Sequence, residues 1–175
     1  MKTSQRLALC GVVSALAAVM LLMTVFPYAT YALAAMAGIV LIPAVLECGT
    51  RYAVLSYIAT AMLALLITPD IEAKWLFILF FGYYPIVHLR LQIRRGAWVW
   101  GVKLVLFNLA AVADFLIMTM VLNVPREEFV IAGVYVPWVL LIAANAVFVL
   151  YDMALYRVSA MYRVRLHPLI KKMMK

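Results

Sequence analysis

The sequence predicts an all-α integral membrane protein with six transmembrane helices, cytoplasmic termini and a cytoplasmic interfacial helix at its C-terminal end. Of its 175 residues, 69% are hydrophobic and 13% are charged, whereas soluble domains are about 45–50% apolar and about 25% charged. A chain this short has too much surface for its volume to keep so much apolar area from water. We therefore expect lipid to surround a single transmembrane domain, residues 1–175, with no segment left over for a soluble catalytic module.

Six apolar runs follow one another along the chain, and each is near the ~20 residues that span a bilayer. Backbone groups without a partner are costly in hydrocarbon, so we expect each run to be a helix. The alternation of apolar and polar residues that marks a barrel strand is absent. The predicted helices cover residues 7–26, 32–48, 52–68, 75–89, 102–122 and 130–151.

Basic residues lie mostly on one side of these helices. Of the 15 Lys and Arg residues, only Lys74 and Arg126 fall in the loops assigned to the outer side, where acidic residues accompany them. The positive-inside rule therefore places both termini in the cytoplasm, as in a multi-pass protein of a bacterial cytoplasmic membrane. Topology and attraction to anionic membrane lipids account for the net charge of +8 without nucleic acid. We expect the basic tail, residues 157–175, to continue as an interfacial helix lying on the membrane.

Small residues recur on the first predicted helix at spacings of three and four. Gly11 and Ala15 form one row, which Ala8 extends, and Ser14 and Ala18 form another. Such rows allow the backbone of a second helix to approach closely. We expect them either to dock a partner subunit or to pack inside the protein.

The fourth predicted helix contains the segment FFGYYPIVH, residues 80–88. Pro85 cannot donate a backbone hydrogen bond, so we expect it to bend the helix beside Gly82. Tyr83 and Tyr84 point about 100° apart on a helix, so at least one should face the bundle, where its hydroxyl needs a partner. The bend either shapes an outward-facing pocket or only improves packing.

Asp114 lies near the membrane centre of the fifth predicted helix, slightly toward the outside. A carboxylate there costs about 2.5–3.5 kcal/mol on insertion scales, and nothing about helix formation requires it. We interpret Asp114 either as a ligand contact in a wet cavity or as one partner of an interhelical hydrogen bond. Asn108 lies deeper, at a depth close to that of Asn145, and we interpret these two amides as a structural pair.

Trp138, Asn145 and Asp152 recur every seven residues on the sixth predicted helix, so they share one face. Tyr135 precedes Trp138 by three residues and joins that face, while Asp152 is placed at the cytoplasmic rim. A polar and aromatic stripe of this kind should face protein or a cavity rather than lipid.

These residues predict an outward-facing pocket beneath the loops at residues 27–31, 68–75 and 123–129. Asp114 would contact a polar or cationic group of the ligand, and aromatic side chains would form the walls. The predicted pocket residues are Asp114, Tyr83, Tyr84, Tyr135, Trp138 and Asn145.

Motifs of membrane enzymes are absent from the sequence. It contains no Gly-x-Ser-x-Gly, no histidines at metal-ligand spacing, no Cys-x-x-Cys and no glycine-rich phosphate loop. The two histidines, His88 and His167, are both placed at the cytoplasmic side and lie far apart in sequence. We therefore expect no enzymatic activity, no metal and no other cofactor.

Six helices, cytoplasmic termini and the small-residue rows Gly11/Ala15 and Ser14/Ala18 resemble the S components, the substrate-binding membrane subunits, of energy-coupling factor (ECF) vitamin transporters. The resemblance covers the whole chain in topology but includes no substrate-specific signature, so it names no vitamin. It implies an outward pocket formed by the later helices and outer loops. It also implies that the first helix docks on a transmembrane T subunit, which two cytoplasmic ATPase subunits drive.

Two alternatives remain open. A non-transporting scaffold of the MreD cell-shape type is similar in size and helix number, and there the polar stripes would be protein contacts. A small homodimeric transporter or channel is the other.

Overall fold

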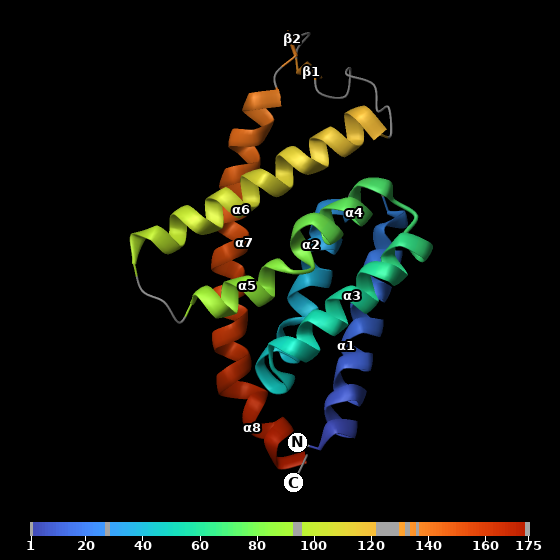
Figure 1. Cartoon of the computed structure of the whole chain (residues 1–175), viewed down its shortest axis with the longest axis vertical. Coiled ribbons are helices and arrows are strands. Elements are labelled where there is room, and N and C mark those ends of the chain that lie inside the picture. Colours follow the sequence, from blue (N-terminus) through green and yellow to red (C-terminus); the bar gives the residue numbers. More distant parts are fainter. Residues whose placement is uncertain are drawn as a thin grey trace.

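The computed structural model describes residues 2–26, 29–92, 96–121, 130–131, 134–135 and 137–173, and nearly all of them are helical (Figure 1). The first half comprises α1 (Thr3–Leu22), the 3₁₀ turn η1 (Met23–Val25), α2 (Thr30–Val40), the π-helical turn η3 (Ala44–Cys48) and α3 (Thr50–Ile67). The second half comprises α4 (Ile71–Leu76), the π-helical turn η4 (Phe77–Phe81), α5 (Tyr84–Leu91), α6 (Ala97–Leu116), the π-helical turn η5 (Ile117–Val121), α7 (Pro137–Arg165) and α8 (His167–Met173). Between α6 and α7, the two-residue strands β1 (Val130–Ile131) and β2 (Val134–Tyr135) pair antiparallel.

Five helical segments in the described part of the chain are long and apolar enough to cross a membrane, which supports a membrane protein. They are Thr3–Val25, Thr30–Cys48, Thr50–Ile67, Trp98–Met120 and Trp138–Arg165. The fourth predicted helix, residues 75–89, is not among them, because the chain breaks into α4, η4 and α5.

Gly82 and Pro85 explain this break. The amide of Gly82 donates to the carbonyl of Phe77, five residues earlier, at 2.8 Å, so the helix widens into a π turn before it ends. Pro85 then lies in the first turn of α5, where a proline is tolerated. A Cβ on Gly82 would lie 2.6 Å from the ring of Tyr57, so glycine permits the close approach of α3 at this point.

Helices α1, α2 and α3 form a tightly packed bundle because alanines line their contacts. Ala17, Ala34 and Ala53 are all completely buried, and the hydroxyl of Ser14 on α1 donates to the carbonyl of Ser56 on α3 at 3.3 Å. Small side chains bring helix backbones close, which suits packing in a membrane.

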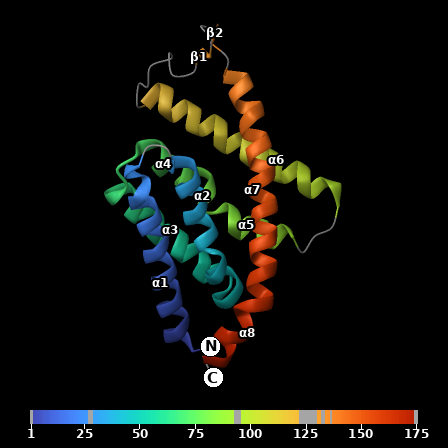
Figure 2. The ribbon, with the colours of Figure 1, turned by 180° about the vertical axis from the view of Figure 1, so that it is seen from behind.

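Helix α7 runs along the length of the molecule, and α6 crosses it (Figure 2). It begins at Pro137 and continues to Arg165, whereas the sequence predicts a helix over residues 130–151. Much of the predicted interfacial tail is therefore the end of α7, and only α8 follows as a separate helix. His167 Nδ1 lies 2.8 Å from Glu47 Oε1, which joins α8 to η3.

An aromatic cluster joins α6 and α7 to η4 and α5. The rings of Phe107 on α6 and Phe148 on α7 stack with their centroids 4.7 Å apart, and Phe80 stacks on Tyr84 at 4.6 Å. Both termini lie at the same end of the molecule (Figure 1).

Candidate functional site

The residues of the predicted pocket do not all come together. Tyr84 is completely buried, and its hydroxyl donates to Asp152 Oδ1 at 2.6 Å. Tyr83 instead faces Tyr57 and Phe80, with ring centroids 6.2 and 6.4 Å away. The two tyrosines therefore point to different sides of α5, as their helical spacing predicts.

On α7, Trp138 and Asn145 have different surroundings. The side chain of Trp138 is 75% exposed, so it faces lipid or a partner rather than the interior of this chain. Asn145 Nδ2 donates to Asn108 Oδ1 at 3.0 Å, and Asn108 Nδ2 donates to Asn145 Oδ1 at 2.9 Å. This reciprocal bond confirms the predicted amide pair, while the side chain of Tyr135 lies outside the described residues.

Asp114 is partly buried near the end of α6. Its Oδ1 is shielded from solvent and has no hydrogen-bond partner among the described residues. Glu72 is near enough for its charge to act on this carboxyl group, and Glu72 in turn accepts a hydrogen bond of 2.6 Å from the hydroxyl of Tyr31. Asp114 therefore lies within reach of the charge of Glu72 at the start of α4, which is bonded to Tyr31 at the start of α2. Its Oδ1 nevertheless forms no hydrogen bond with the described residues.

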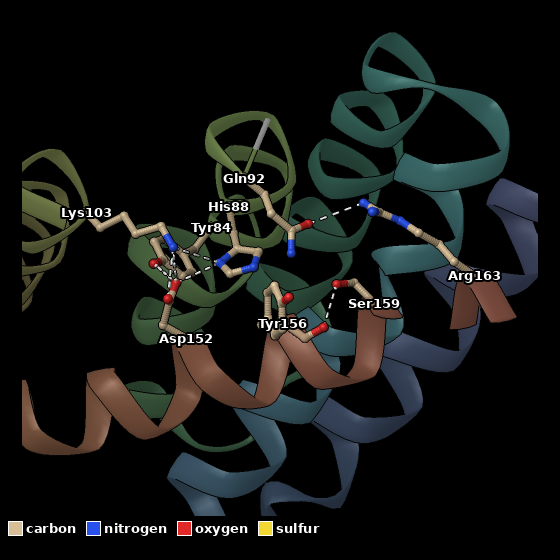
Figure 3. A network of polar contacts seen from close by, with 8 residues as sticks. All are labelled: Tyr84, His88, Gln92, Lys103, Asp152, Tyr156, Ser159 and Arg163. Atoms are coloured by element: carbon tan, nitrogen blue, oxygen red, sulfur yellow. Dashed lines mark hydrogen bonds and ion pairs between the residues drawn. The ribbon is translucent and has the colours of Figure 1, made fainter. Parts of the chain in front are cut away.

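A second polar site lies at the junction of α5, α6 and α7, with Asp152 at its centre (Figure 3). Lys103 Nζ is 2.8 Å from both carboxylate oxygens of Asp152. His88 Nδ1 lies 2.6 Å from Oδ1, the same oxygen that Tyr84 contacts. Only 6% of Lys103, 4% of Asp152 and 1% of His88 is exposed, so these groups are removed from solvent and lipid alike. We call Tyr84, His88, Lys103 and Asp152 the buried charge cluster.

The local sequence positions each member of this cluster. Tyr84 and His88 are four residues apart, so both project from the same face of α5. Lys103 lies two turns into α6, and its ammonium group is 5.2 Å from the ring centroid of Trp100, within the range of a cation–π contact. Asp152 lies near the middle of α7 rather than at a helix end.

The contacts determine where the protons lie. Oδ1 of Asp152 faces three donors, the Tyr84 hydroxyl, the Lys103 ammonium group and His88 Nδ1. An ionised carboxylate accepts all three bonds, whereas a protonated one would bring a competing donor. Lys103 Nζ also lies 3.3 Å from His88 Nδ1, but Nδ1 is much closer to Asp152 Oδ1, at 2.6 Å, and a carboxylate oxygen can only accept. We therefore assign an ionised Asp152, a charged Lys103 and a hydrogen on His88 Nδ1, since hydrogen positions follow from the bonding pattern.

The sequence predicts Tyr84 as a site residue but does not predict the cluster around it. The order of apolar runs places His88 at the cytoplasmic side, and it places Asp152 at the cytoplasmic rim because the last run ends at residue 151. The spacing of Tyr84 and His88, together with the isolated Lys103 inside an otherwise apolar run, is the signal that points to an interior partner.

The small residues of α1 divide between two faces. Ala8, Gly11 and Ala15 are exposed, and a Cβ on Gly11 would meet no described atom within 4 Å. Ser14 and Ala18 are buried inside the bundle. One row thus serves internal packing, and the other is open to lipid or a partner.

Among the described residues, no group of three or more His, Cys, Asp or Glu side chains is arranged to hold a metal ion. Comparisons with protein-family models, with curated proteins and with solved structures find no match for this chain.

Proposed function

We propose that the protein is the solute-binding subunit of an ATP-driven importer of the ECF type in a bacterial cytoplasmic membrane. In this proposal Asp114 contacts a polar or cationic group of the solute. The supporting observation is the shielded Oδ1 of Asp114, which has no partner among the described residues. Buried polar atoms normally have a hydrogen-bond partner, and an ionisable residue inside a membrane helix is a functional candidate by default.

The surroundings of Asp114 favour a ligand that is not strongly anionic. The charges of Asp114, Glu72 and Asp70 all act on Tyr31. Asp70 is already engaged, since its Oδ1 accepts from the amide of Ala73 at 2.8 Å and its Oδ2 accepts from Thr30 at 3.2 Å. Asp114 thus adds a further acceptor where negative charge already gathers. A cationic or hydrogen-donating ligand would meet attraction there, whereas an anion would meet repulsion.

The open row on α1 supports a partner subunit in the same proposal. Ala8, Gly11 and Ala15 leave the backbone of α1 accessible, which is the kind of surface that lets another membrane helix dock closely. We assign this row to contact with a transmembrane T subunit, whose attached ATPases would supply the energy.

Mass spectrometry of small molecules released by denaturing the gently purified protein tests the proposal. We expect a stoichiometric, water-soluble compound from the unaltered protein and its loss from Asp114→Asn. The matched control is Glu47→Gln, the same change of carboxylate to amide at a residue bonded to His167, and it should retain the compound.

Release of phospholipid alone, with co-purifying proteins unaffected by Asp114→Asn, would overturn the proposal. That result would favour a scaffold of the MreD type, in which the polar residues serve protein contacts. A compound retained equally by Asp114→Asn would place the ligand elsewhere in the molecule.

A further inference from the structure

Polar side chains of α5 and α7 face one another along a seam that leads away from the buried charge cluster (Figure 3). At its inner end, Tyr84 and His88 contact Asp152. At its outer end, Arg163 Nη2 donates to Gln92 Oε1 at 3.3 Å. The two contacts show that α5 and α7 run in the same direction here. The polar seam comprises Tyr84, His88 and Gln92 from α5, and Asp152, Tyr156, Ser159 and Arg163 from α7.

The seam is buried at its inner end and exposed at its outer end. His88 and Ser159 are each 1% exposed, whereas Gln92 is partly exposed and Arg163 is exposed. Tyr156, which lies between Asp152 and Ser159 on α7, is also exposed. Ser159 Oγ donates to the carbonyl of Tyr156 at 2.9 Å, which leaves its oxygen able to accept a bond. The seam therefore connects a buried site to the surface, near the end of α7 that leads to the C-terminus.

His88 has one ring nitrogen with no partner in this arrangement. Its Nδ1 is engaged by Asp152, but its Nε2 is shielded and has no hydrogen-bond partner among the described residues. Figure 3 shows the Nε2 edge of the ring turned away from Asp152, toward the side on which Gln92, Tyr156 and Ser159 lie. A buried polar nitrogen without a hydrogen-bond partner costs free energy. Nε2 is therefore available to bind a proton or to form a hydrogen bond with a group that enters the site.

The buried charge cluster contains more basic groups than acidic groups. One carboxylate, Asp152, faces two basic groups, Lys103 and His88, and it neutralises one of them. With Nδ1 carrying a hydrogen, neutral His88 offers a lone pair at Nε2, which is the basic site of the ring.

We propose that Nε2 of His88 is a proton-binding site that is reached from the surface along the polar seam. The proton comes from water at the outer end of the seam and binds the lone pair of Nε2. No bond in the cluster breaks, and His88 becomes an imidazolium whose Nδ1–H still donates to Asp152. The second positive charge beside Lys103 then opposes the contact of α6 with α5, so proton uptake is linked to the packing of these helices. The proposal does not depend on the ligand assigned to Asp114.

Helices α2, α3 and α7 and the turn η4 pack on α5, and α6 brings Lys103 to His88. The titratable groups in contact with it are Asp152 from α7, Lys103 from α6 and Tyr84 from α5 itself. Tyr156 from α7 lies on the side that Nε2 faces (Figure 3), and its side chain is exposed. The titratable side chains of α2 and α3 make their contacts elsewhere or are exposed. Tyr31 contacts Glu72, Tyr52 contacts Arg6, and Tyr57 donates to the Ile78 carbonyl. Arg51 is exposed. The turn η4 carries no titratable residue.

Nitrogen NMR of protein labelled with ¹⁵N-histidine tests the proposal directly, because the chain has only two histidines. His167→Gln removes the second signal and assigns the first. In its neutral form His88 should carry its hydrogen on Nδ1. Lowering the pH stepwise should add a reversible proton at Nε2. A hydrogen on Nε2 in the neutral form, or no protonation of Nε2 at any pH at which the protein stays folded, would overturn the proposal.

Two variants test the charge argument and the route. Lys103→Met leaves Asp152 to serve His88 alone, so the affinity of Nε2 for a proton should rise about tenfold, and an unchanged affinity would contradict the shared carboxylate. Gln92→Leu places an apolar side chain at the mouth of the seam. It should slow exchange between the neutral and protonated signals while leaving their ratio at each pH unchanged. An unchanged exchange rate would refute the route.

The measurement on unaltered His88 tests the proton-binding site by itself, so the site can be decided even if either variant fails to fold.

Discussion

The hydroxyl of Tyr84 donates a 2.6 Å hydrogen bond to Asp152 Oδ1, although 68 residues separate the two in the chain. Tyr84 is also stacked on Phe80, with ring centroids 4.6 Å apart. A buried Tyr needs both apolar contact for its ring and a partner for its hydroxyl, and here η4 and α7 supply one each. Asp152 is therefore a central attachment point for α5 and α6 on α7, which makes its carboxylate important to the fold as well as to the proton chemistry.

Replacing Asp152 with Asn should destabilise the protein by about 3–5 kcal/mol, because it leaves the buried ammonium group of Lys103 without a counterion. Chemical unfolding of the protein in detergent micelles measures the loss. The double variant Lys103→Met with Asp152→Leu should recover much of it, since replacing both charges by apolar groups removes the unpaired charge. A double variant as unstable as Asp152→Asn would show that the charges themselves are not responsible.

The amide pair between Asn108 and Asn145 should make a smaller contribution. Hydrogen bonds between membrane helices average about 0.6 kcal/mol in double-mutant cycles, because unfolded helices in a membrane also find partners. We expect a coupling energy of that size from Asn108→Ala, Asn145→Ala and the combined variant. A coupling energy above about 2 kcal/mol would mean that the pair holds α6 on α7 far more strongly than such bonds usually do.

Glycine substitutions should separate a close backbone contact from an open surface. A Cβ on Gly38 would overlap the carbonyl oxygen of Phe81, so Gly38→Ala forces α2 away from η4 and should cost about 1–3 kcal/mol. Gly11→Ala meets no described atom within 4 Å and should leave stability equal or higher by up to about 1 kcal/mol. Thermal unfolding of both variants measures the contrast, and equal losses would contradict it.

The sequence predicts the first half of the fold more closely than the second. The first three apolar runs correspond to α1, α2 with η3, and α3, because a long apolar run in lipid has few alternatives to a helix. The fourth run differs because Gly82 and Pro85 do more than bend the helix, and they end it. Hydropathy also cannot show that α7 continues past Asp152, since charged residues are tolerated in a helix when its neighbours bury and pair them.

The candidate site also contains features that the sequence predicts and features that only the tertiary packing decides. The predicted stripe on the last membrane helix is correct only in part: Asn145 and Asp152 contact other helices, whereas Trp138 on the same face is 75% exposed. Matching depth correctly pairs Asn145 with Asn108. Periodicity cannot show that Tyr84 meets Asp152 rather than Asp114, because that choice depends on how α5 is turned after the break at Gly82. A lone polar residue in an apolar run therefore indicates a buried partner, but the tertiary packing decides which partner it is.

The two membrane aspartates should respond oppositely when each is changed to Asn in ligand-free protein. Asp152 loses the pairing of a buried ammonium group, whereas Asp114 has no partner for Oδ1 among the described residues and lies within reach of the charge of Glu72. Asp114→Asn should therefore leave the free energy of unfolding unchanged or raise it by up to about 1 kcal/mol, because like-charge repulsion is relieved. The same unfolding measurement compares the two variants under identical conditions. If Asp114→Asn instead costs as much as Asp152→Asn, then Asp114 has a structural partner in the folded protein, and its assignment to ligand binding loses its main support.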